Sequence, residues 1–200
     1  DLVLEADLTP GQIRELGILA EGYGFRAIWA QNYARALDAF MSVMPLAEAT
    51  SRIGIGVVVV SPYEMHPLKM ANALLTLNEF SQGRAMMVVG AGGEWPGVMA
   101  VGYGKRVTGF REALDIVKGA CAGKVLNYKG EIYRSRAWIA HWHHAPRPPL
   151  VYGGASGPKM LATAARAADG VMMSDMALPM LDKPIATLRE ALAAEGRDPA

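Results

Sequence analysis

Short apolar runs alternate along the chain with segments in which hydrophobic residues recur at helical spacing. The apolar runs predict six strands, at residues 2–4, 27–30, 53–60, 85–89, 150–152 and 170–173. Each strand precedes a predicted helix, at residues 10–22, 38–47, 66–80, 108–122, 156–168 and 185–194. The run at 53–60 is β-branched and apolar on both faces, as a buried parallel strand is. Six successive β–α units predict an α/β fold with a parallel sheet.

The residues that flank these segments support the helix boundaries. Thr9 is a good N-cap and Pro10 a good first helical residue, while Gly22 and Gly24 can end the same helix. Asp38 is placed to cap the second helix. His66 stands immediately before a proline, so we expect it at a helix start rather than as a catalytic base.

The segment 126–149 interrupts the alternation of strands and helices. It contains Tyr128, Tyr133, Trp138 and Trp142 together with three prolines. We interpret it as an insertion on one rim of a single domain that spans residues 1–200, rather than as a linker.

Composition and charge exclude several classes of protein. Twenty basic residues against nineteen acidic ones give a net charge of +1, so a nucleic-acid partner is not expected. No apolar run approaches the roughly twenty residues of a transmembrane helix, and no signal peptide is recognised, so the expected location is the cytoplasm. The single cysteine, Cys121, excludes a disulfide framework within the chain and a cysteine-only zinc site.

Functional residues of parallel α/β folds lie at the carboxyl ends of the strands. The stretches that follow the predicted strands here are Gln31-Asn32-Tyr33, Ser61-Pro62-Tyr63, Gly90 to Trp95, Gly153 to Gly157, and Ser174-Asp175 after Met173. These stretches are the candidates for a binding or catalytic site.

The stretch Gly153 to Pro158 is the clearest of the candidates. Its small residues allow a ligand to approach the backbone closely, and Ser156 supplies a hydroxyl at a predicted helix start. Because the N-terminus of a helix favours an anion, a phosphate site is one interpretation. An ordinary capped helix after a tight turn is the other.

The glycine-rich stretch Gly90 to Glu94 does not complete a dinucleotide-binding fingerprint, because Trp95 stands at the position of the third glycine. Glu94 is either a proton donor or cofactor ligand at a strand end, or a surface charge. The histidines His141, His143 and His144 have no cysteine or carboxylate beside them, so no metal site is expected.

Several runs together resemble a known family. They are residues 20–29, His66-Pro67 through Ala73, Thr76-Leu77, Ser81, Gly83-Arg84, Gly90-Ala91-Gly92, residues 149–156, Ala165-Arg166 and Ala168-Asp169-Gly170. In this order they resemble the bacterial luciferase-like flavin and deazaflavin enzymes over nearly the whole chain. The resemblance is strongest to the methylenetetrahydromethanopterin reductase-like branch, which uses the 5-deazaflavin coenzyme F420.

The resemblance implies a TIM-barrel variant with a cofactor at the carboxyl ends of the strands, and a homodimer. It implies a bulge after the third strand that supports the flat ring, with a cis or strongly distorted peptide within residues 57–61, near Val58-Val59. The cofactor-binding residues that it implies are Gln31, Val58, Val59, Ser61, Gly92, Gly154, Ala155, Ser156, Gly157 and Met173. Glu94 and Asn32 are the catalytic candidates.

Two features depart from the family pattern. Many deazaflavin relatives carry Asp-His after the second strand, whereas this chain has Gln31-Asn32, and a neutral amide cannot serve as a base at pH 7. Six β–α units also fall short of the eight in a barrel, which usually takes about 250 residues. We therefore expect the native polypeptide to continue past Ala200 with two more units.

The function expected from the resemblance is hydride transfer between coenzyme F420 and a small organic substrate. In such an enzyme the cofactor supplies the chemistry, and the protein positions the ring and excludes water. An FMN-dependent monooxygenase of the same fold is the first alternative. A non-catalytic member that binds a flavin or a partner protein is the second.

Overall fold

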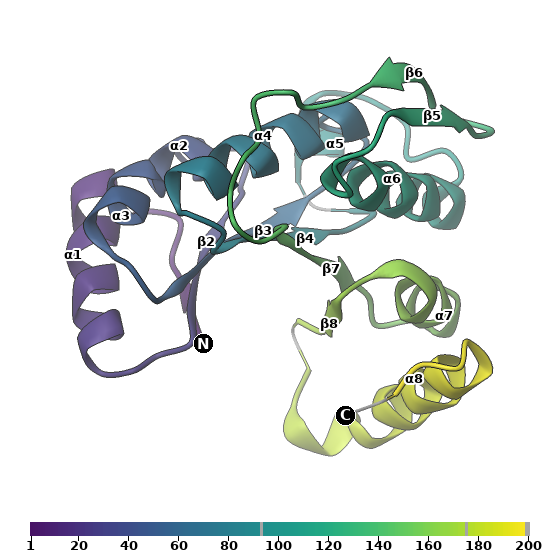
Figure 1. The fold of residues 1–200 in the computed structure, drawn as a ribbon. Coiled ribbons are helices and arrows are strands. Elements are labelled where there is room, and N and C mark those ends of the chain that lie inside the picture. Colours follow the sequence, from purple (N-terminus) through teal and green to yellow (C-terminus); the bar gives the residue numbers. More distant parts are fainter. Residues whose placement is uncertain (93, 175, 199–200) are drawn as a thin grey trace.

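Six parallel strands form one curled sheet in the order β1-β2-β3-β4-β7-β8 (Figure 1). The computed structural model describes residues 1–92, 94–174 and 176–198, so Gly93 and Asp175 of the candidate stretches lie outside the described residues. The strands are β1 (Leu2–Leu4), β2 (Ala27–Gln31), β3 (Gly54–Val60), β4 (Ala85–Val89), β7 (Leu150–Gly154) and β8 (Gly170–Met172). All six predicted strands are confirmed, with ends that agree to within two residues.

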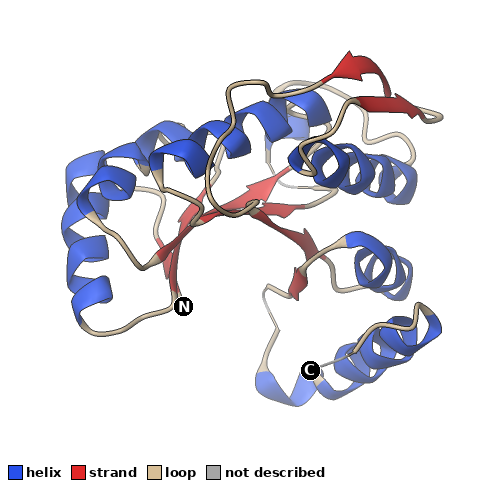
Figure 2. Ribbon diagram, viewed as in Figure 1, coloured by secondary structure: helices blue, strands red, loops and turns tan. Residues whose placement is uncertain are grey.

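The helices lie on the outer side of this sheet, which curls into a partial barrel (Figure 2). They are α1 (Pro10–Gly22), α2 (Ala39–Ser42), α3 (Met44–Ala49), α4 (Pro67–Phe80), α5 (Trp95–Val98), α6 (Arg106–Cys121), α7 (Pro158–Ala167) and α8 (Asp182–Ala194), with a 3-10 turn η1 (Leu178–Met180) before α8. Within the described part of the chain, no helix has the length and apolar character needed to cross a membrane.

The local boundary signals hold for α1 and α4. Thr9 forms a capping box with Gln12, Pro10 is the first residue of α1, and Gly24 adopts a φ of 78° just past the end of that helix. His66 is the N-cap of α4, and its ring Nδ1 accepts the backbone N–H of Leu68 at 3.2 Å. The interpretation of His66 as a helix-start residue is therefore confirmed.

The second predicted helix, 38–47, is wrong as a single element. Asp38 does cap a helix, because its side chain accepts the N–H of Met41 at 2.8 Å, but that helix ends at Ser42. A separate helix, α3, begins at Met44. Pro45 explains the break, since it has no N–H to continue the hydrogen-bond ladder of α2.

The segment 126–149 begins with an antiparallel hairpin of β5 (Leu126–Lys129) and β6 (Arg134–Trp138), which is separate from the main sheet. The hairpin lies alongside α6 (Figure 1). Its turn reaches the loop after β3, where the hydroxyl of Tyr133 donates to the carbonyl oxygen of Pro62 at 2.7 Å.

The concave face of the sheet is filled by aromatic rings at its amino end. Trp29 packs over Gly56, where an added Cβ would lie 2.1 Å from the indole ring, and meets Tyr152 edge-on at 5.3 Å. Asp1 closes this end, because it accepts the indole N–H of Trp29 at 3.0 Å and the guanidinium of Arg26 at 2.8 Å. The carboxyl end of the concave face opens into a cavity.

Gly56→Ala tests whether the indole ring fixes the concave face. The new methyl group overlaps the ring of Trp29, and overpacking of this kind costs about 1–3 kcal/mol of unfolding free energy. Gly22→Ala is the matched control, because nothing lies within 4 Å of its added Cβ, and it should leave stability within about 0.5 kcal/mol or raise it. Urea unfolding measures both, and equal stabilities would contradict this packing argument.

Candidate functional site

A cavity of about 630 Å³ opens at the carboxyl ends of the strands. It is lined by Val3, Gln31, Asn32, Tyr33, Val58, Val59, Val88, Gly90, Ala91, Gly92, Glu94, Gly154, Ala155, Ser156, Met172, Met173 and Ser174. Ten of the twelve residues proposed from the sequence lie in this lining, and Ser61 and Gly157 do not. The structure therefore brings together positions from the ends of β2, β3, β4, β7 and β8.

One wall of the cavity is an irregularity within β3. The pairing of β3 with β4 shifts register between Val57 and Val60, and the peptide bond between Val58 and Val59 is cis. The cis peptide expected within residues 57–61 is confirmed, although the bulge lies inside the strand rather than after it. Gly90 faces this bulge closely, because an added Cβ there would lie 2.4 Å from Cγ1 of Val59.

Asn32 makes three hydrogen bonds, two to the bulge and one to Glu64. Its backbone N–H donates to the carbonyl oxygen of Val58 at 2.7 Å. Its side-chain Nδ2 donates to the carbonyl oxygen of Val59 at 3.1 Å and to Oε1 of Glu64 at 2.6 Å. The neighbouring Gln31 has a buried Oε1 to which no group of the described residues donates.

The carboxylate behind Asn32 was not among the residues proposed from the sequence. Glu64 lies four residues beyond the end of β3, and its Oε1 also accepts the N–H of Ser61 at 3.0 Å. Burial raises the pKa of Glu64 to about 7, and the hydrogen bonds from Ser61 and Asn32 only partly oppose this. In the sequence, the position of Glu64 shortly after the end of a predicted strand was the signal that could have marked it as a site residue.

Two of the proposed residues support loops. Ser61 is fully buried, and its Oγ accepts the N–H of Tyr63 at 3.2 Å, so its side chain stabilises the turn after β3. Glu94 is exposed at the cavity, and its Oε2 accepts the N–H of Ala34 at 3.0 Å. Glu94 thereby joins the loop after β4 to the loop after β2.

The turn after β7 differs in detail from its sequence prediction. Helix α7 begins at Pro158, with Gly157 as its N-cap, so Ser156 is not at the helix start as expected. Proline suits the first helical position because its φ is preset and it needs no hydrogen-bond acceptor. The N–H of Ala155 is also engaged, since it donates to the carbonyl oxygen of Met172 at 3.2 Å. The donors that remain are Ser156 and the first turn of α7, which no side chain caps.

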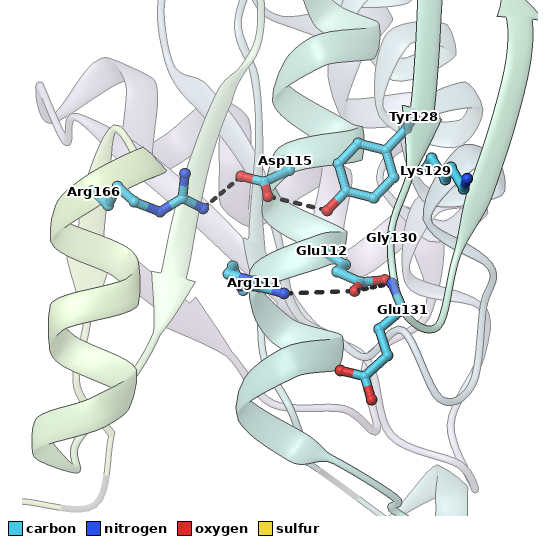
Figure 3. A pocket seen from close by; sticks show the side chains of 8 residues that line it. All are labelled: Arg111, Glu112, Asp115, Tyr128, Lys129, Gly130, Glu131 and Arg166. Atoms are coloured by element: carbon cyan, nitrogen blue, oxygen red, sulfur yellow. Dashed lines mark hydrogen bonds and ion pairs between the residues drawn. The ribbon is translucent and has the colours of Figure 1, made fainter.

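A second cavity, of about 510 Å³, lies between α6, the hairpin turn and α7 (Figure 3). Its central carboxylate, Glu112, is fully buried and accepts the N–H groups of Glu131, Ile132 and Tyr133 at 2.7, 3.0 and 2.9 Å. Burial alone would raise the pKa of Glu112, but the three N–H donors outweigh burial and lower it.

Asp115, another carboxylate of the second cavity, is also engaged. Asp115 accepts a hydrogen bond from Arg166 at 2.6 Å and one from the hydroxyl of Tyr128 at 3.1 Å (Figure 3). The carboxylates of this cavity thus hold the hairpin and α7 against α6, which is a structural role. We therefore place the candidate site at the strand ends.

Comparison with known proteins gives the same picture for fold and family. The family model described as luciferase-like monooxygenase matches residues 3–200. The 5,10-methylenetetrahydromethanopterin reductase of Archaeoglobus fulgidus is 34% identical over 157 residues, which cover 78% of this chain and 47% of that protein. The F420-dependent glucose-6-phosphate dehydrogenase of Gordonia bronchialis is 28% identical, with 80% of this chain and 52% of that protein covered.

Among solved structures, the coenzyme F420-dependent tetrahydromethanopterin reductase of Methanopyrus kandleri superposes with a TM-score of 0.86 at 25% identity. The match covers 98% of this chain and 61% of that one. The chain therefore spans about half the length of the two curated relatives described above.

The raised pKa of Glu64 predicts a pH-dependent contribution to stability. A carboxyl group whose folded pKa exceeds its unfolded value stabilises the fold below the unfolded pKa, and this stabilisation is lost as pH rises through about 7. Glu64→Gln, which cannot ionise, should thus have a melting temperature that exceeds wild type by more at pH 8 than at pH 5. The exposed Glu15→Gln is the control, and a difference independent of pH would contradict the prediction.

Proposed function

The chain belongs to the luciferase-like monooxygenase family, and from this premise we propose that it binds coenzyme F420 in the strand-end cavity and serves hydride transfer to or from a small organic substrate. The observation that carries this proposal is the cavity itself. It combines the bulge at Val58-Val59 with residues small enough for a flat ring and a phosphate to approach the backbone. The relatives that are named F420-dependent support the choice of cofactor.

The residues of the cavity fit such a cofactor. A volume of about 630 Å³ lies within the range of pockets that bury a drug-sized or cofactor-sized ligand. The bulge and the facing Gly90 leave a surface without bulky side chains on which a flat ring can rest. At the opposite side, Gly154 and Ser156 leave the backbone before α7 accessible to a phosphate.

The side chains of the cavity can bind and orient the cofactor and exclude water from it. Val58, Val88 and Met172 give the concave face an apolar wall, which keeps water away from a bound ring. Asn32 is a neutral amide and acts as a hydrogen-bond partner, not as a base. Glu94 is the carboxylate among the described residues of the cavity lining, so we propose that it holds or moves the proton that accompanies turnover. A bound deazaflavin supplies the hydride chemistry.

An FMN-dependent monooxygenase is the second candidate, and the description of the matching family favours it. The same flat ring and phosphate would occupy the same cavity, so the fold alone does not separate the two cofactors. We further propose that the protein is a homodimer, as the family resemblance implies, which light scattering of the purified chain tests.

Titration with both cofactors tests the proposed function. We expect saturable binding of coenzyme F420, followed by its fluorescence, and at least about tenfold weaker binding of FMN, a difference of roughly 1.4 kcal/mol. Tight FMN binding together with weak F420 binding would support the monooxygenase. If neither cofactor binds, the proposal of a flavin or deazaflavin site in this chain is wrong.

Ser156→Ala tests the phosphate end of the cavity. The variant removes one hydrogen bond to a charged group, worth roughly 1.5–3 kcal/mol, which corresponds to about a ten- to hundredfold loss of cofactor affinity. Gly157→Glu should lower affinity further, because it adds a bulky like charge beside the phosphate. Thr163→Ala, which removes an exposed hydroxyl from the same α7, is the control and should bind as wild type. Unchanged affinity in both site variants would place the phosphate elsewhere.

A further inference from the structure

Glu64 and Asn32 form a half-buried pair at the β2 end of the cavity. Asn32 lines the cavity, whereas Glu64 is not among the described lining residues and is hydrogen-bonded to Asn32. We propose that Glu64 is a positioning residue that turns the carbonyl oxygen of Asn32 toward the cavity, so that the β2 end accepts a hydrogen bond from the ligand. The identity of that ligand rests on the proposed function, but the orientation of Asn32 does not.

The partners of Asn32 allow only one orientation of its amide group. The carbonyl oxygen of Val59 can only accept a hydrogen bond, and it lies 3.1 Å from the side-chain nitrogen. Oε1 of Glu64 lies 2.6 Å from the same nitrogen and accepts its second hydrogen. Both N–H groups of the amide are therefore used on the protein side. Oδ1 is left as the atom that a ligand in the cavity can meet.

Glu64 is itself fixed by the turn after β3. The same Oε1 accepts the backbone N–H of Ser61 at 3.0 Å, and the N–H of Glu64 donates to the carbonyl oxygen of Ser61 at 3.1 Å. The carboxyl is thus anchored to the chain segment that leaves the bulge. Oε1 of Glu64 is thereby held within hydrogen-bond distance of the side-chain nitrogen of Asn32.

A second amide at the same edge points to the same kind of ligand. Oε1 of Gln31 is buried, and within the described ranges no group donates to it. A buried carbonyl without a donor is unfavourable. Because this oxygen has almost no accessible surface, a ligand N–H or O–H would satisfy it once the side chain of Gln31 turns into the cavity. The two amide carbonyls together select a ligand edge that donates hydrogen bonds and disfavour one that only accepts them.

The first experiment needs no cofactor. In the 15N-labelled chain, the side-chain amide of Asn32, assigned by its absence in Asn32→Ala, should exchange slowly with solvent because both hydrogens are bonded. Glu64→Gln keeps a carbonyl oxygen for both donors and should preserve this signal. Glu64→Leu removes the acceptor and should speed exchange at least about tenfold. Equal protection in wild type and Glu64→Leu would overturn the proposal.

The second experiment measures ligand affinity in the same variants, with coenzyme F420 and FMN as probes. We expect Glu64→Gln to bind within about threefold of wild type and Glu64→Leu to bind at least about tenfold more weakly, while Glu15→Leu, an exposed control on α1, binds as wild type. Equal losses in Glu64→Gln and Glu64→Leu would show that the charge of the carboxylate matters instead, which also overturns the proposal. If neither probe binds wild type, the proposed function fails, and the amide-exchange result alone decides the role of Glu64.

Discussion

The shift in register between β3 and β4 is the feature on which the candidate site depends. It places Val59 against Gly90 and turns the carbonyl oxygens of Val58 and Val59 toward Asn32. Regular parallel pairing would direct successive carbonyls into the ladder between neighbouring strands. The carbonyl oxygen of Val58 accepts the backbone N–H of Asn32, whereas that of Val59 accepts its side-chain amide. The end of β2 is therefore tied to β3 by both groups, and the turn that carries Glu64 starts directly beyond them.

The concave face divides into a closed half and an open half through the sizes of its side chains. At the amino end Trp29 and Tyr152 meet over Gly56 and Gly170, which have no side chains to displace the rings. At the carboxyl end the sheet opens into a cavity whose lining includes Val58, Gly90 and Ala155. One sheet thereby provides both a packed core and a ligand cavity, as the inward-facing layers of barrel folds do.

Local signals were sufficient for most of the fold. Apolar runs located the six strands of the main sheet but not the hairpin strands β5 and β6, and caps such as Thr9 located helix ends, because these signals depend on residues adjacent in sequence. The break at Pro45 was also readable, but the apolar spacing across it favoured one helix. Non-local contacts decided what was missed at the site. The N–H of Ala155 donates to a carbonyl oxygen of β8. Glu64 contacts the site through Asn32, where the turn after β3 meets the end of β2.

The neutral pair Gln31-Asn32 restricts what the chain itself can do chemically. The amide of Asn32 neither gains nor loses a proton near pH 7, and the carboxyl group hydrogen-bonded to it is not among the described lining residues. The side chains of Gln31 and Asn32 can therefore offer hydrogen bonds at this edge but no acid or base, and among the described lining residues Glu94 is the carboxylate. A site built in this way contributes orientation and the exclusion of water. Such a contribution suits a cofactor that brings its own redox chemistry.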